Sequence, residues 1–164
     1  MKKVFTCLLI IYSIVLTACP KDTAVRKAAK ASFELSGLTL DVVNATGKAY
    51  DAGIIGLDAK DRLAAAEKRV ATGGKHFNEI LTAFNTQTSG NLTPEQVQLL
   101  SKIFSDEVVT PFLTILQELS VISLDQVQYL RTAIAALRTA ILVISGTFAD
   151  AGYTEANRRL LTYA

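Results

Sequence analysis

Apolar residues recur along most of the chain at alternating steps of three and four, the spacing of one face of an α-helix. Short runs of glycine or polar residues divide this pattern into four long segments. The first segment extends from about Asp22 to Ala52, and Gly53 and Gly56 follow it. Its stripe consists of Ala28, Ala31, Leu35, Leu38, Val42, Ala45 and Ala49. We therefore expect a long first helix.

The second segment contains two adjacent glycines in its middle. Asp58 is a good N-cap, so we expect the helix to begin there and to reach about Thr88. The seven-residue spacing passes unaltered through Gly73 and Gly74, which favours one continuous helix with close approach of a neighbouring backbone at Gly73. A kink at this point is the alternative. The stripe consists of Leu63, Ala66, Val70, Gly73, Phe77, Ile80 and Phe84.

The third segment follows a turn from Ser89 to Thr93 and opens with a strong local signal. In Thr93-Pro94-Glu95-Gln96, the threonine caps, the proline takes the first helical position and the glutamine completes a capping box. The spacing slips to two four-residue steps around Val108, and Pro111 follows the slip. We expect a kink there or two shorter helices. The stripe consists of Val97, Leu100, Phe104, Val108, Phe112, Ile115 and Leu119.

The fourth segment begins at a second capping-box pattern, Ser123 with Gln126. Arg131 and Arg138 stand beside its stripe. Arg138 leaves only Thr139–Ala149 as an uninterrupted apolar run, which is shorter than the ~20 residues that a membrane span needs. We therefore expect a core helix. The stripe consists of Val127, Leu130, Ile134, Leu137, Ile141, Ile144 and Phe148.

The connections between these helices are short, which favours antiparallel packing of consecutive helices. Ala151 and Gly152 end the fourth helix, and Thr154 can cap a short tail helix that reaches Leu161. The expected fold is all-α: an up-down-up-down four-helix bundle with a short C-terminal helix, formed by residues 23–164. A helical hairpin array with another packing order is the alternative.

The N-terminus has the pattern of a bacterial leader peptide. Lys2 and Lys3 precede the apolar run Val4–Leu16, and Leu16-Thr17-Ala18-Cys19 resembles the lipobox of bacterial lipoprotein precursors. The resemblance implies that residues 1–18 are a signal peptide. It also implies that Cys19 becomes a lipid-bearing N-terminus on a short tether, residues 19–22, in the cell envelope. The alternatives are an uncleaved membrane helix, for which 13 residues are too few, and an ordinary secretory leader.

The leader changes the composition of the mature chain. Its removal takes away Lys2 and Lys3, so the net charge falls from +2 to zero, which argues against nucleic-acid binding. Cys7 is lost with the leader, and Cys19 alone cannot form an internal disulfide. The remaining basic cluster, Lys21, Arg26, Lys27 and Lys30, follows the anchor. It either adds up to ~1 kcal/mol per residue of attraction to an anionic bilayer, or it is a solvated helix face.

No catalytic or metal-binding constellation is predicted. His76 and Glu79 reverse the Glu-x-x-His step of di-iron bundles. The sequence contains no second histidine to complete such a site, so His76 is expected at the surface. The acid pairs Asp58–Asp61 and Asp106–Glu107 fit solvated helix faces. No G-x-S-x-G nucleophile elbow or phosphate-binding loop is present in the sequence. We therefore expect no metal, cofactor or enzymatic activity.

These patterns favour a membrane-anchored helical module that binds another envelope protein. Two surfaces are candidates: the exposed third-helix region around Pro111, and the tail Tyr153–Ala164. The alternative is a carrier of an apolar small molecule in a cavity between the helices. Such a cavity would be lined by small residues and by Phe77, Phe84, Phe104 and Phe112; a packed core is the ordinary interpretation of the same residues.

Overall fold

The computed structural model describes residues 24–88, 91–120 and 128–148 of the 164-residue chain. Every regular element in these ranges is helical, which confirms the all-α class. The elements are α2 (Ala24–Asp51), α3 (Leu57–Thr88), α4 (Pro94–Phe104), the π-helical turn η1 (Ser105–Val109), α5 (Thr110–Leu119) and α6 (Gln128–Phe148). The predicted leader with Cys19, the cap at Ser123 and the tail helix lie outside the described residues.

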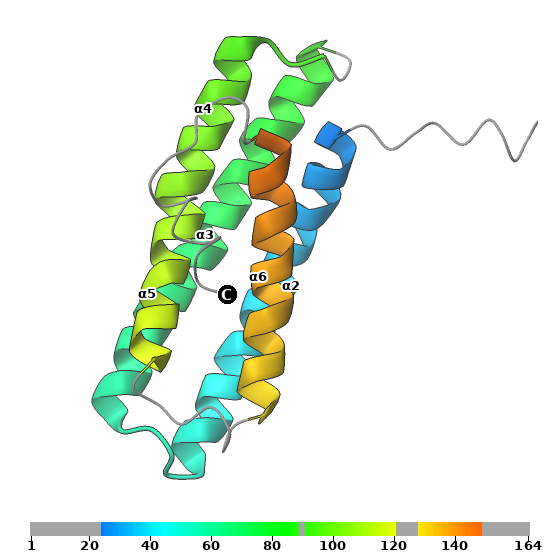
Figure 1. Ribbon diagram of the computed structural model, residues 1–164. Helices are drawn as coiled ribbons and strands as arrows, with labels where there is room; N and C mark the ends of the chain where they lie inside the picture. The colour runs from blue at the N-terminus through cyan, green and yellow to red at the C-terminus, as the bar shows by residue number, and fades with distance from the viewer. Residues whose placement is uncertain (1–23, 89–90, 121–127, 149–164) are drawn as a thin grey trace, which may run out of the picture.

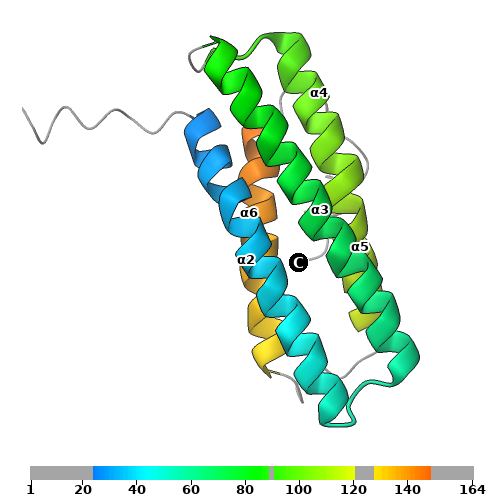
Figure 2. The same cartoon turned by 180° about the vertical axis from the view of Figure 1, so that it is seen from behind.

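The helices lie alongside one another (Figures 1 and 2). α2 packs against both α3 and α6, and α3 also packs against α4, η1 and α5. α6 completes the set through contacts with α4 and η1. Buried apolar side chains from all six elements form one continuous core, which stabilises the described part of the chain through removal of apolar surface from water.

The predicted stripes account for most of this core. All six described stripe residues of α6 are buried, from Leu130 to Phe148. In α3, Leu81 is buried whereas Ile80 and Phe84 are only half-buried, so the stripe drifts by one residue near the helix end. α6 is also long and apolar enough to cross a membrane by composition, a property that it shares with core helices of globular proteins. Its buried stripe fits a core helix.

The described helix ends from α2 to α4 agree with the predicted signals except at one residue. Gly53 has φ +70°, and the Ile54 N–H donates to the Ala49 carbonyl, which closes the end of α2 with a Schellman motif. Asp58 is not the N-cap of α3, and that prediction is wrong. The Gly56 carbonyl accepts the Lys60 N–H at 3.0 Å, so Gly56 takes the N-cap position, two residues earlier than expected.

The predicted capping box at the start of α4 is confirmed. The Gln96 N–H donates to the Thr93 hydroxyl at 3.3 Å, and the Thr93 N–H donates to the Gln96 side-chain oxygen at 2.9 Å. Pro94 occupies the first helical position, where its missing N–H leaves no hydrogen bond unmade. α4 therefore begins at the predicted residue.

Candidate interaction groove beside the π-helical turn

The slip in the third segment corresponds to the π-helical turn η1. The Thr110 N–H donates to the carbonyl of Ser105, five residues back, and the Thr110 hydroxyl donates to the same oxygen at 3.0 Å. The wider turn accommodates an extra residue, so side chains four apart stay on the buried face. This confirms that the third segment consists of two α-helices, α4 and α5. The buried series is Leu100, Phe104, Val108 and Phe112.

Pro111 explains why the hydrogen-bond pattern changes at this point. Proline has no N–H, so the Glu107 carbonyl, four residues earlier, lacks its ordinary α-helical donor. Pro111 itself is buried, which corrects the expectation of an exposed third-helix region centred on this residue. The side chains exposed around it are Asp106, Thr110 and Thr114.

Gly73 on α3 faces the same carbonyl. A Cβ placed on Gly73 would lie 2.6 Å from the carbonyl carbon of Glu107 and 2.8 Å from its Cβ, and closer still to the oxygen. Atoms cannot approach that closely, so only glycine fits here without movement of the backbone. α3 runs unbroken through Gly73 and Gly74. The continuous helix with a close backbone contact is therefore confirmed, and the kink alternative is wrong.

A surface groove of about 430 Å³ borders this contact. Lys68, Arg69 and Thr72 lie on its α3 wall, and Asp106 and Glu107 lie on its η1 wall. It is completed by Gly73, Thr110, Pro111 and Thr114. The groove thus combines cations on one wall, carboxylates on the other, and three hydroxyl groups. Such groups form directional hydrogen bonds and ion pairs with a polar partner.

The π-helical turn also brings a carboxylate to His76. The Nδ1 atom of His76 lies 2.7 Å from Oε2 of Glu107, and both side chains are about half exposed. Glu79, the neighbour of His76 that the sequence singled out, instead pairs with Lys75 at 3.9 Å. His76 is a surface residue, as predicted. Among the described residues, no group of three or more His, Cys, Asp or Glu side chains is placed to hold a metal ion.

A buried carboxylate between α2 and α3 was missed by the sequence analysis. Glu67 is only 1% exposed, and the Thr46 hydroxyl donates to its Oε1 at 2.7 Å. Its Oε2 is buried without a hydrogen-bond partner. Burial raises the pKa of Glu67 above its ordinary value, and the hydrogen bond from Thr46 offsets part of this effect. The signal in the sequence is a seven-residue series of buried hydroxyl residues on α2: Ser32, Thr39 and Thr46.

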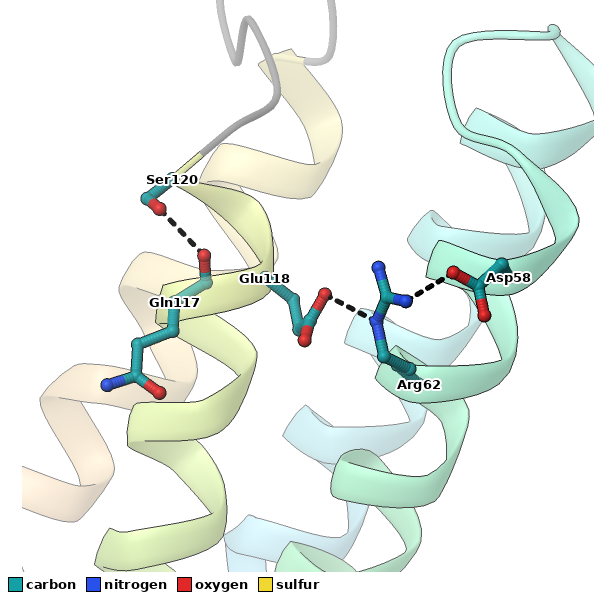
Figure 3. A network of polar contacts seen from close by, with 5 residues as sticks. All are labelled: Asp58, Arg62, Gln117, Glu118 and Ser120. Atoms are coloured by element: carbon teal, nitrogen blue, oxygen red, sulfur yellow. Dashed lines mark hydrogen bonds and ion pairs between the residues drawn. The ribbon is translucent and has the colours of Figure 1, made fainter.

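An exposed ion-pair network links the start of α3 to the end of α5 (Figure 3). Arg62 donates from Nε to Glu118 at 2.9 Å and also pairs with Asp58 one turn away. The hydrogen bond to Glu118 is the main cause that raises the pKa of Arg62. Directly after α5, the Ser120 hydroxyl donates to the Gln117 carbonyl at 2.7 Å. Arg62 and Asp58 are exposed and Glu118 is half-buried, so the pairs stabilise the fold only weakly. Asp58 and Glu118 are committed to structural pairs.

The chain matches no protein family model, no curated protein and no solved structure. Of the predicted functional positions, Cys19 and the tail Tyr153–Ala164 lie outside the described residues. The region near Pro111 is described, and it forms one wall of the groove.

Proposed function

We propose that the protein is a bacterial envelope lipoprotein whose helical domain binds another envelope protein. Residues 1–18 are removed, and acylated Cys19 anchors the chain to the cytoplasmic or the outer membrane, with the domain outside the cytoplasm. The lipobox-like run before Cys19 supports this location. We assign no enzymatic reaction, cofactor or nucleic-acid binding to the domain.

We further propose that the domain is an up-down-up-down four-helix bundle, with a short C-terminal helix after α6. The packing pairs support this arrangement, because α2 contacts α3, α3 contacts α4, η1 and α5, and α6 contacts α2 as well as α4 and η1. The short connection after α2 leads directly into α3 beside it (Figure 1). A bundle of this kind presents rigid helix faces to a partner.

The close contact between Gly73 and Glu107 is the observation that carries the proposal of a binding groove. It holds a π-helical turn against a glycine, and π-helical turns occur frequently at functional sites. The groove beside it is formed by rigid helices rather than by loops, so little ordering is needed when a partner binds. Its opposed charges and hydroxyl groups fit a polar peptide segment that carries both acidic and basic side chains.

Photo-crosslinking in intact cells tests this groove. A photoreactive amino acid at Thr114, in the groove, should give a discrete adduct of higher mass with an envelope protein. The same amino acid at Thr132, an exposed position on α6, serves as the control and should give no such adduct. Thr110→Arg fills the groove and should abolish the Thr114 adduct. An equal adduct at both positions, or one that is insensitive to Thr110→Arg, would contradict the proposal.

The carrier alternative has less support from the packing. The Phe77 ring lies 4.9 Å from that of Phe104 and 5.8 Å from that of Phe148, in tilted and edge-on arrangements. These rings fill the space in which an apolar ligand would lie. Thermal stabilisation of the purified protein by fatty acids would favour the carrier over the interaction module.

A further inference from the structure

The outward face of α2 carries large apolar side chains that no described helix covers. Phe33 is 78% exposed and Leu40 is 57% exposed. The seven-residue spacing places both on one side of the helix, and Gly37 between them has open space around it. We call Lys30, Phe33, Gly37 and Leu40 the outer face of α2. Figure 2 shows α2 from a side on which no other helix lies in front of it.

The charges around this face are arranged along the helix. Lys27 and Lys30 are exposed and precede Phe33, whereas the exposed acids Glu34 and Asp41 follow it. The end of the face nearest the N-terminus is therefore basic. Across the α2–α3 boundary, Lys75 lines the same surface hollow as Phe33 and Leu40, and the acids Glu34 and Asp41 line the hollow as well. An exposed aromatic side chain that follows exposed lysines along a helix is a pattern of helices that lie on anionic membrane surfaces.

The proposed anchor places this face close to a bilayer. Ala24 is five residues after Cys19, and a chain of that length extends over at most about 18 Å. Phe33 lies nine residues further along α2, roughly 14 Å at the helical rise. Once the acyl chains are inserted in the bilayer, the length of the tether limits how far the basic end of α2 can move from the membrane surface. Even weak contacts between α2 and lipids then become effectively intramolecular.

We propose that the outer face of α2 lies on an anionic bilayer surface, with Phe33 among the headgroups and with Lys27 and Lys30 against lipid phosphates. The inference rests on the proposed acylation of Cys19. It defines the orientation of the domain, because a bilayer against α2 leaves the groove between α3 and α5 open to a partner. Two acyl chains give the attachment, and the outer face of α2 gives the orientation.

Tryptophan fluorescence tests the contact, because the chain contains no natural tryptophan. Acylated full-length Phe33→Trp protein is placed on vesicles of phosphatidylethanolamine and phosphatidylglycerol that contain brominated acyl chains. We expect a blue-shifted emission and at least a twofold loss of intensity relative to unbrominated vesicles. Leu99→Trp, at a 46% exposed position on α4, is the matched control and should be unquenched. Circular dichroism checks that both variants are folded.

The charge contribution is tested in the same system. Lys27→Glu with Lys30→Glu should abolish quenching of the Phe33→Trp variant, while the acylated protein stays bound to the vesicles. Equal, weak quenching at Phe33→Trp and Leu99→Trp on bound protein overturns the inference and leaves the anchor intact. A blue shift without bromolipid quenching indicates a protein contact and also overturns it. An unmodified Cys19 in the purified protein contradicts the proposed function, and the inference fails with it.

Discussion

The Glu107 carbonyl occupies the space that a side chain on Gly73 would need. This relationship unites two features that are far apart in the sequence: the unbroken passage of α3 through two glycines, and the π-helical turn before Pro111. Pro111 removes the donor that this carbonyl would have in an α-helix, and Gly73 allows the carbonyl to approach α3. The groove and the His76–Glu107 pair both border this contact.

Substitution of Gly73 tests the contact directly. Gly73→Ala should lower the free energy of unfolding by about 1–3 kcal/mol, because the added methyl group overlaps the Glu107 backbone. Gly73→Leu should cost more, although leucine has the higher helix propensity. Urea unfolding monitored by circular dichroism gives the measurement.

Gly74 provides the matched control one residue away. A Cβ there would lie 3.4 Å from Cδ1 of Leu35, an ordinary packing distance. Gly74→Ala should therefore stabilise the protein by a few tenths to about 1 kcal/mol, since alanine restricts the unfolded chain and favours the helix. Equal effects at the two glycines would show that the contact at Gly73 is absent in solution.

The stripe of α6 gives a second stability test. Ile134 and Ile141 are buried in the core, whereas Thr132 and Thr139 are exposed on the same helix. Aspartate at either isoleucine should lower the free energy of unfolding by at least about 3 kcal/mol, through lost packing and a desolvated charge. Thr132→Asp and Thr139→Asp should cost much less. Chemical denaturation of the four variants makes the comparison, and equal losses would place the core on a different face.

Glu67 is expected to make stability depend on pH. Burial holds its pKa in the folded chain above the ordinary value of 4.5 that it regains on unfolding. As the pH rises from the ordinary pKa through the folded pKa, the folded state binds more protons than the unfolded state, so stability falls. Glu67→Gln keeps an oxygen for Thr46 and removes the charge. It should stabilise the protein above this interval by on the order of 1 kcal/mol.

The gain from Glu67→Gln should disappear below pH 4, where the carboxyl group is protonated in both states. Thermal unfolding at a series of pH values measures it. Glu79→Gln is the control, because the Glu79 side chain is 61% exposed and pairs with the Lys75 ammonium at the surface. A gain at Glu67 that does not change with pH would show that its carboxylate is not the source.

The periodicity of the sequence predicted the helices well because burial in a helical domain follows the 3.6-residue repeat directly. Six buried positions of α6 and the cap at Thr93 were read from local patterns alone. The slip to four-residue steps around Val108 also showed where the third segment departs from regular α-helical geometry. The slip does not specify which residue packs against the Glu107 carbonyl. The Glu107–Gly73 contact joins two helices, and no local pattern encodes which residues meet across that interface.

Buried polar and exposed apolar side chains were harder to predict. Glu67 lies beside the stripe residue Ala66, and charged residues in that position are usually solvated. Its burial depends on Thr46 of a different helix. Phe33 lies outside the α2 stripe, so its exposure follows from the repeat, but its grouping with Leu40 and the nearby lysines becomes evident only when the covered sides of α2 are known.

The most direct test of the account is the intact mass of the protein extracted from cell membranes. We expect a chain that begins at Cys19 and carries a diacylglyceryl group, with residues 1–18 absent. Cys19→Ala should give an unacylated chain that is either uncleaved or found in the soluble fraction. A membrane-bound protein that retains residues 1–18, or a mature Cys19 with a free thiol, would contradict the account.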